Sequence, residues 1–82
     1  MEFRYTQKFK KQFKKLPQNV QDNFAERVDL LVSDPTNPKL RLHPLKGKFV
    51  GYWSMNVTGD VRALYREDGE RIIIFFFFFK HS

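Results

Sequence analysis

The sequence predicts a single α+β domain, residues 1–82, with the element order β-α-α-β-β-β, in which a helical hairpin packs on a mainly antiparallel sheet. Three patterns lead to this fold class. Apolar residues alternate with polar ones at the N-terminus, recur at helical spacing in the segment that follows, and alternate again after residue 51 between glycine-containing turns. A chain of 82 residues can bury one hydrophobic core and is too short for a second domain.

The first half of the chain predicts one strand and two helices. Phe3 and Tyr5 form the apolar face of a short strand, and Thr6 is expected to cap the helix that follows. Apolar residues at helical spacing continue until Pro17, which ends this helix and begins a second one at residues 17–32. Because the join is short, the helices form an antiparallel hairpin whose apolar faces need a sheet to cover.

The second half predicts a basic loop at residues 36–49 and then three strands. The strands are expected at residues 51–58, 61–66 and 71–79. Gly59-Asp60 and residues 67–70 provide the turns, so the strands pair as antiparallel hairpins. In the first of these strands, Trp53, Met55 and Val57 are expected on the buried face, and Tyr52, Ser54 and Asn56 on the other face.

Five consecutive phenylalanines, Phe75 to Phe79, end the last predicted strand. Three of them can fill the core, and the alternate ones must point to the opposite face, where they line a cleft or contact solvent. With the three isoleucines before them they form an aggregation-prone segment if they are exposed, and a covering partner would remove that exposure.

Composition restricts the class of protein. The chain has 15 Lys and Arg against 9 Asp and Glu, a net charge of +6, which favours a polyanionic partner such as nucleic acid or an acidic protein. There is no cysteine, so a disulfide framework and a thiolate metal site are excluded, and no metal or other cofactor is expected. The N-terminal segment is too charged for a signal peptide, and no apolar run is long enough for a membrane helix. We therefore expect a cytoplasmic protein without membrane contact.

Three residues are candidates for acid–base or phosphate chemistry: His43, Arg62 and His81. Each also has an ordinary structural explanation. A lone histidine is more often structural or incidental than catalytic, so His43 can be an exposed loop imidazole before a proline and His81 a terminal residue, and Arg62 can be a surface partner of Asp60. Residue types alone leave these alternatives open.

Four motifs in residues 43–82 resemble the RelE toxin superfamily, most of all its YoeB and YafQ branches of ribosome-dependent mRNA interferases. The motifs are Leu45-Lys46-Gly47, Gly51-Tyr52-Trp53-Ser54, Val61-Arg62-Ala63-Leu64-Tyr65 and the apolar strand that ends in Lys80-His81-Ser82. The element order of the whole chain agrees with the superfamily. The resemblance implies a toxin that is bound by a cognate antitoxin and acts on mRNA and ribosomal RNA at the ribosome.

The resemblance also implies roles for individual residues. His43 would be the general base, Arg62 would contact the scissile phosphate, and His81 would be the general acid. Tyr52 would lie on the side that contacts nucleic acid, whereas Trp53 is expected in the core. The residues that would contact the RNA are Lys46, Lys48, Tyr52, Ser54, Asn56 and Arg66.

The chain departs from the family at its C-terminus. An aromatic residue usually follows the last histidine, whereas this sequence stops at Ser82, and Phe77 to Phe79 replace small or polar residues before His81. Two alternatives to the ribonuclease therefore remain. One is a ParE-like inhibitor of DNA gyrase, and the other is a degraded toxin that only binds its antitoxin. No residue pattern fixes the oligomeric state.

Overall fold

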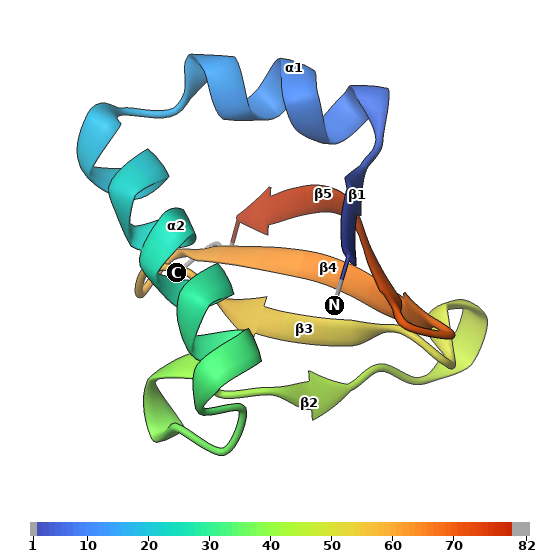
Figure 1. Cartoon of the computed structure of the whole chain (residues 1–82). Coiled ribbons are helices and arrows are strands. Elements are labelled where there is room, and N and C mark those ends of the chain that lie inside the picture. Colours follow the sequence, from blue (N-terminus) through green and yellow to red (C-terminus); the bar gives the residue numbers. More distant parts are fainter. Residues whose placement is uncertain (1, 80–82) are drawn as a thin grey trace.

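The computed structural model describes residues 2–79, which form a five-stranded sheet with two helices on one face (Figure 1). The strand order is β1-β5-β4-β3-β2. β1 runs parallel to β5, and all other neighbouring strands are antiparallel. The strands are β1 (Glu2–Tyr5), β2 (His43–Pro44), β3 (Trp53–Asn56), β4 (Val61–Asp68) and β5 (Arg71–Phe79). The predicted class, a helical hairpin on a mainly antiparallel sheet, is confirmed.

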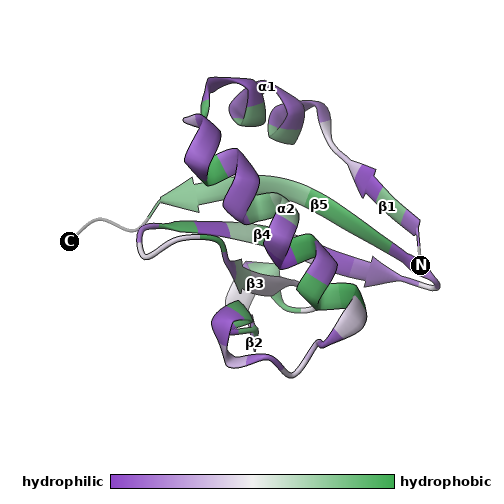
Figure 2. Ribbon diagram, turned by 60° about the vertical axis from the view of Figure 1, so that its left-hand side comes forward, coloured by the Kyte–Doolittle hydropathy of each residue, from purple (hydrophilic) through white to green (hydrophobic). Residues whose placement is uncertain are grey.

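The two helices begin and end close to the predicted residues. Thr6 caps α1 (Gln7–Lys15), because its Oγ1 accepts a hydrogen bond of 3.1 Å from the Phe9 amide. Pro17 immediately precedes α2 (Gln18–Ser33). Figure 2 shows that the outward surfaces of both helices are mostly hydrophilic and that β5 is hydrophobic along most of its length. The buried helix residues are Phe9, Phe24 and Leu31.

Residues 36–49 differ from the predicted loop. They contain two short 3₁₀ helices, η1 (Pro38–Leu40) and η2 (Gly47–Phe49), with β2 between them. β2 pairs with β3 and forms one edge of the sheet. A strand of two residues is too short for an alternating pattern, so periodicity could not reveal it.

Two of the predicted strands have different lengths in the structure. β3 occupies only the middle of the predicted residues 51–58, and β4 continues to Asp68 instead of ending at residue 66. The second turn is therefore shorter than predicted and consists of Gly69 and Glu70. Gly69 has a φ of 64°, which matches the glycine that a type II′ turn requires at its first central position.

A bulge in the β4–β5 pairing decides which residues of β5 reach the core. Leu64 pairs with Phe76 and Tyr65 pairs with Ile74, so Phe75 is an extra residue without a partner on β4. Alternation along β5 is shifted by one residue at this point. Ile74 and Phe77 are consequently both buried in the core under the helices.

The prediction that three phenylalanines of the run fill the core is wrong, because only Phe77 of the five is buried. Its ring centroid lies 4.7 Å from that of Phe9 and 5.3 Å from that of Phe24. Phe76 and Phe78 are half-buried on the opposite face, and Phe79 is 47% exposed. The bulge is the physical reason, since a strict period of two cannot place both Ile74 and Phe77 on one face.

The edge of β5 is covered by side chains from the first helix. β1 ends at Tyr5, opposite Ile74, so the last part of β5 has no strand on that side. Thr6 donates a side-chain hydrogen bond to the Phe75 carbonyl. Gln12 binds Phe77 twice: Nε2 donates to the carbonyl at 3.0 Å, and Oε1 accepts from the amide at 2.7 Å. The Gln12 amide thus replaces a neighbouring strand and protects an exposed edge.

We predict that Gln12→Ala lowers the free energy of unfolding by about 1–3 kcal/mol, because it leaves both backbone groups of a buried residue without partners. Helix propensity works against this loss, since alanine is the better helix former. Gln7→Ala, on an exposed position of the same helix, is the matched control and is expected to change stability by less than about 0.5 kcal/mol. Urea denaturation measures both. Equal stabilities of the two variants would contradict the edge-covering role.

Tyr65 gives the fold a dependence on alkaline pH. Burial, with a smaller effect of the Glu67 carboxylate, raises the pKa of Tyr65 to about 12 from its ordinary 10.0. Between these two values the unfolded chain releases the phenolic proton more readily than the folded chain does. The stability that Tyr65 contributes is therefore present below pH 10 and is lost as the pH rises towards 12. We predict a shallower loss of stability over this pH range in Tyr65→Phe, measured as urea midpoints. If the urea midpoints of the variant and the wild type fell in parallel with rising pH, this would contradict the raised pKa of Tyr65.

Candidate functional site

The sheet face opposite the helices, here called the open face, carries both candidate residues that the structure describes. Directly opposed residues on neighbouring strands point to the same face. Met55, Ala63 and Phe77 belong to the core under the helices, so the residues that alternate with them lie on the open face. One row across the open face is His43, Ser54, Leu64 and Phe76, and the next row is Asn56, Arg62 and Phe78.

His43 and Arg62 share the open face without touching. They are separated by two strand spacings, about 10 Å, and by an offset of two residues, about 7 Å along the strand. His43 is exposed, and its Nδ1 lies 3.4 Å from the Arg41 carbonyl oxygen. Arg62 is half-buried and forms no ion pair within residues 2–79. The guanidinium is therefore available to an external anion.

An apolar pocket of about 400 Å³ lies on the open face. Phe49, from η2, lies over the sheet with its ring centroid 6.4 Å from that of Phe76, and the rings of Phe76 and Phe78 are 6.5 Å apart. These aromatic faces are arranged edge to face rather than stacked, with interplanar angles of 68°. The residues that line the pocket are Leu45, Phe49, Leu64, Phe76 and Phe78.

Cations lie over aromatic rings of the open face. The Lys8 Nζ is 4.6 Å from the centroid of Phe76, and the Lys48 Nζ is 5.3 Å from that of Phe49. The Arg66 guanidinium carbon lies 5.4 Å from the ring centroid of Phe75 and 5.7 Å from that of Tyr52. Such contacts hold positive charge above apolar surface. The open face thus combines aromatic side chains with three cations.

Lys8 is a site residue that the sequence did not identify. It belongs to α1, whose lysines all occupy the hydrophilic surface of an amphipathic helix. Helical periodicity separates this surface from the apolar one, but it cannot show which lysine reaches around the edge of β5. The position of α1 beside that edge follows from tertiary contacts of Thr6 and Gln12.

The structure brings most of the other predicted RNA-contacting residues near the same face. Tyr52 is half-buried, with its ring centroid 5.1 Å from that of Phe75. Asn56 is half-buried and pairs with Arg62, and Lys46 is exposed at the beginning of η2. Trp53 packs partly buried against the core, as predicted. His81 lies outside the described residues.

Ser54 requires a correction. The sequence places it among the residues that would contact RNA, but its exposed fraction is 0%, and its Oγ has no hydrogen-bond partner in the described part of the chain. It is a small residue flanked in its row by two larger ones, His43 and Leu64. Alternation identified its face but gave no information on how deeply the neighbouring side chains would cover it.

Residues 2–79 contain no group of three or more histidines, aspartates and glutamates that is positioned to hold a metal ion. Among the helices of the same residues, none is long and apolar enough to cross a membrane.

Comparison with known proteins identifies the family. Residues 1–82 match the model of the YafQ family, described as bacterial toxins of type II toxin–antitoxin systems. The chain belongs to the YafQ family. The resemblance to the RelE superfamily near its YoeB and YafQ branches is thereby confirmed. No curated protein sequence matches the chain.

Solved structures support the YafQ-family fold. A YoeB/ParE toxin from Agrobacterium tumefaciens has a TM-score of 0.81 and 21% identity, with 99% of this chain and 100% of that chain covered. YafQ from E. coli has a TM-score of 0.77 and 19% identity, covering 93% of this chain and 89% of that one. The toxin–antitoxin complex RelBE2 from Mycobacterium tuberculosis has a TM-score of 0.67 and 27% identity, covering 96% of each chain.

We predict that Ser54→Ala raises the free energy of unfolding by about 1 kcal/mol, because it removes a buried hydroxyl without a partner. Urea denaturation measures the stability. A lower free energy of unfolding in the variant than in wild type would contradict the burial of Ser54 without a partner.

Proposed function

We propose that this YafQ-family toxin is a metal-independent endoribonuclease that cleaves mRNA on the ribosome in the cytoplasm. The observation that carries the proposal is the placement of His43 and Arg62 on one face of the sheet, beside an aromatic pocket. A base and a phosphate-binding cation are needed together for RNA cleavage, and single-stranded RNA presents bases and phosphates to one surface. The family match supports the toxin class.

The proposed reaction uses the RNA's own 2′-hydroxyl. A base, His43, removes the 2′-proton, and the oxygen attacks the adjacent phosphorus. The bond from phosphorus to the 5′-oxygen breaks, and His81 protonates that oxygen, which leaves a 2′,3′-cyclic phosphate and a 5′-hydroxyl. Imidazole suits both proton transfers because its ordinary pKa is about 6.5. Arg62 stabilises the additional negative charge, since its planar fork can bind two phosphate oxygens and stays charged.

The remaining contacts position the RNA. The rings of Tyr52, Phe76 and Phe78 offer apolar surface to unpaired bases, and base–aromatic stacking contributes about 1–3 kcal/mol per base. Lys46, Lys48 and Arg66 bind phosphates beside these rings, and Asn56 lies next to Arg62 in the same row. The lysines of α1 are available for ribosomal RNA. No cofactor takes part in the proposed reaction.

We further propose a cognate antitoxin as protein partner. An apolar pocket of about 430 Å³, here called the groove, lies on the helical side of the molecule, where the rings of Tyr5, Phe9 and Phe13 are stacked and two lysines complete the rim. An acidic amphipathic segment fits this combination of apolar floor and positive rim. The groove is lined by Tyr5, Phe9, Lys10, Phe13, Lys14 and Phe24.

One observation favours a second candidate, a toxin that binds its antitoxin without cleaving RNA. The pocket beside Arg62 is lined only by apolar side chains, where a nuclease uses polar groups to orient its substrate. In this alternative the phenylalanines are covered by the antitoxin. The two candidates differ in whether the folded wild-type protein cleaves RNA.

We predict that Arg62→Ala reduces mRNA cleavage on translating ribosomes by at least about 100-fold, because the charge that develops on the phosphate loses its counter-ion. Stability should be unchanged, since Arg62 forms no ion pair within the described residues. Arg4→Ala removes the same charge at the exposed β1 edge and should cleave like wild type. Primer extension maps the cuts.

The outcomes separate the candidate functions. Cleavage by wild type that persists in Arg62→Ala would contradict the assigned role. A folded wild-type protein that does not cleave would contradict the ribonuclease itself. A DNA gyrase supercoiling assay would then distinguish a gyrase inhibitor from a toxin that only binds its antitoxin.

A further inference from the structure

A second concentration of positive charge lies at one end of the sheet, away from the aromatic pocket. Here a pocket of about 480 Å³ is formed by α2, η1, the residue after η1 and the β3–β4 hairpin. One cation comes from α2 (Arg27), one from η1 (Lys39) and one from the residue after η1 (Arg41). The lining is completed by Pro38, Asn56 and Gly59.

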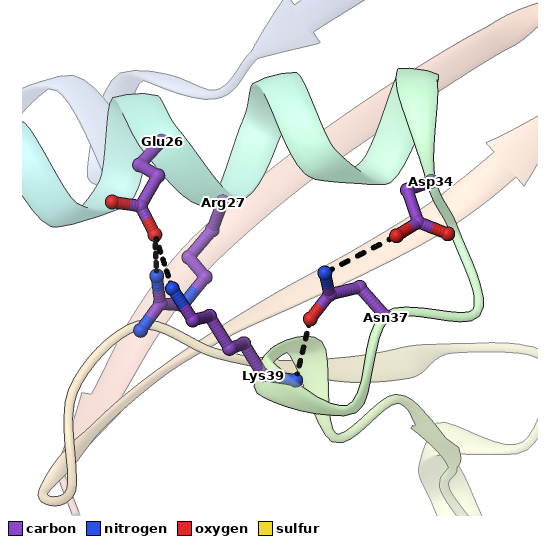
Figure 3. A network of polar contacts seen from close by, with 5 residues as sticks. All are labelled: Glu26, Arg27, Asp34, Asn37 and Lys39. Atoms are coloured by element: carbon purple, nitrogen blue, oxygen red, sulfur yellow. Dashed lines mark hydrogen bonds and ion pairs between the residues drawn. The ribbon is translucent and has the colours of Figure 1, made fainter.

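The charge of this pocket is only partly compensated. Figure 3 shows that Glu26 contacts both Arg27 and Lys39, and it does so through one oxygen, Oε1. The contact with the Lys39 Nζ is loose, at 3.8 Å, and both Lys39 and Glu26 are more than half exposed. Arg41 forms no ion pair within residues 2–79. Three cations therefore face one carboxylate.

Two local features show that the pocket is not an ordinary solvated surface. The Arg27 side chain is only 14% exposed, and its Nε is buried without a hydrogen-bond partner in the described part of the chain. A buried donor without an acceptor is uncommon in folded proteins. Arg41 has a φ of 43°, in the left-handed region that residues other than glycine rarely adopt, at the point where η1 ends and the chain turns towards β2.

The pocket lies at the edge of the sheet, between α2 and the end of the row that contains Arg62. His43 pairs with Ser54, so continuing the antiparallel register by two residues brings the backbone of Arg41 level with Asn56. Asn56 lines the pocket and pairs with Arg62 on β4. The backbones of Arg41 and Arg62 are thus about two strand spacings apart, or about 10 Å, with Asn56 between them.

We propose that this pocket is a second phosphate-binding subsite, which binds an RNA phosphate next to the one at Arg62. The inference rests on the proposed function. A polynucleotide carries a charge at every nucleotide, so a strand that crosses from Arg62 to the edge of the sheet brings another phosphate to Arg41. A guanidinium group can bind two phosphate oxygens at once. The Lys39 ammonium group then contacts the bound phosphate instead of Glu26.

The test is the binding of a fluorescently labelled single-stranded oligoribonucleotide, measured by anisotropy at several salt concentrations. Arg41→Asn removes the charge, and asparagine tolerates the left-handed backbone. We expect binding to weaken about tenfold at low salt. The slope of log K against log salt should fall by about 0.7, the value for one lost contact with a single strand. Arg4→Asn, which removes the same charge elsewhere, should keep the wild-type slope.

A second substitution removes a negative charge from the pocket and is expected to have the opposite effect on RNA binding. Glu26→Gln removes the competing carboxylate, so it should tighten RNA binding more than Glu70→Gln, which makes the same change of charge at the β4–β5 turn. Equal slopes for Arg41→Asn and Arg4→Asn, or equal effects of the two glutamate substitutions, would overturn the subsite. So would the absence of RNA binding by wild type.

Failure of the subsite and failure of the proposed function are distinguishable by primer extension. If wild type cleaves on ribosomes and Arg41→Asn shows the wild-type salt slope, the ribonuclease stands and the subsite is overturned. If wild type does not cleave but Arg41→Asn lowers the slope, the ribonuclease is overturned and the phosphate subsite stands.

Discussion

The bulge at Phe75 determines which side chains of β5 fill the core and which line the candidate site. It shifts the alternation of β5 by one residue, so that Ile74 and Phe77 both enter the core while Phe76 and Phe78 point to the open face. Without it, the core under α1 would lose Phe77, whose ring contacts those of Phe9 and Phe24. The same shift creates the aromatic pocket. One irregularity therefore links the stability of the fold to the character of the candidate site.

Hydrogen bonds to β5 also determine the position of α1. Beyond the end of β1, the backbone of β5 bonds to the side chains of Thr6 and Gln12 instead of another strand. This holds α1 along the edge, from where Lys8 reaches the ring of Phe76. Hydrogen bonds that protect an exposed edge thus also bring positive charge to the open face. The aromatic and the cationic parts of the proposed RNA surface have a common structural origin.

Periodicity was sufficient to predict both helices, the Thr6 cap and the mainly antiparallel sheet, because these depend on local patterns of apolar residues. It placed Asn56 on the correct face for the same reason. It failed at β2, which is too short for a pattern, and at the phenylalanines, because five identical residues carry no alternation that could reveal a bulge. The burial of Ser54 and the approach of Arg41 to Asn56 depend on tertiary neighbours, which a single sequence does not specify.

If the proposed function is correct, RNA lies on the open face of the sheet. Zero-length ultraviolet cross-linking of the toxin to ribosome-bound mRNA, with the cross-linked peptides identified by mass spectrometry, shows which face the RNA contacts. We expect cross-links at Tyr52, Phe76 and Phe78, whose rings lie on the open face, and none at Phe13 or Phe24 on the helical side. Cross-links confined to the helical side would refute RNA binding on the open face.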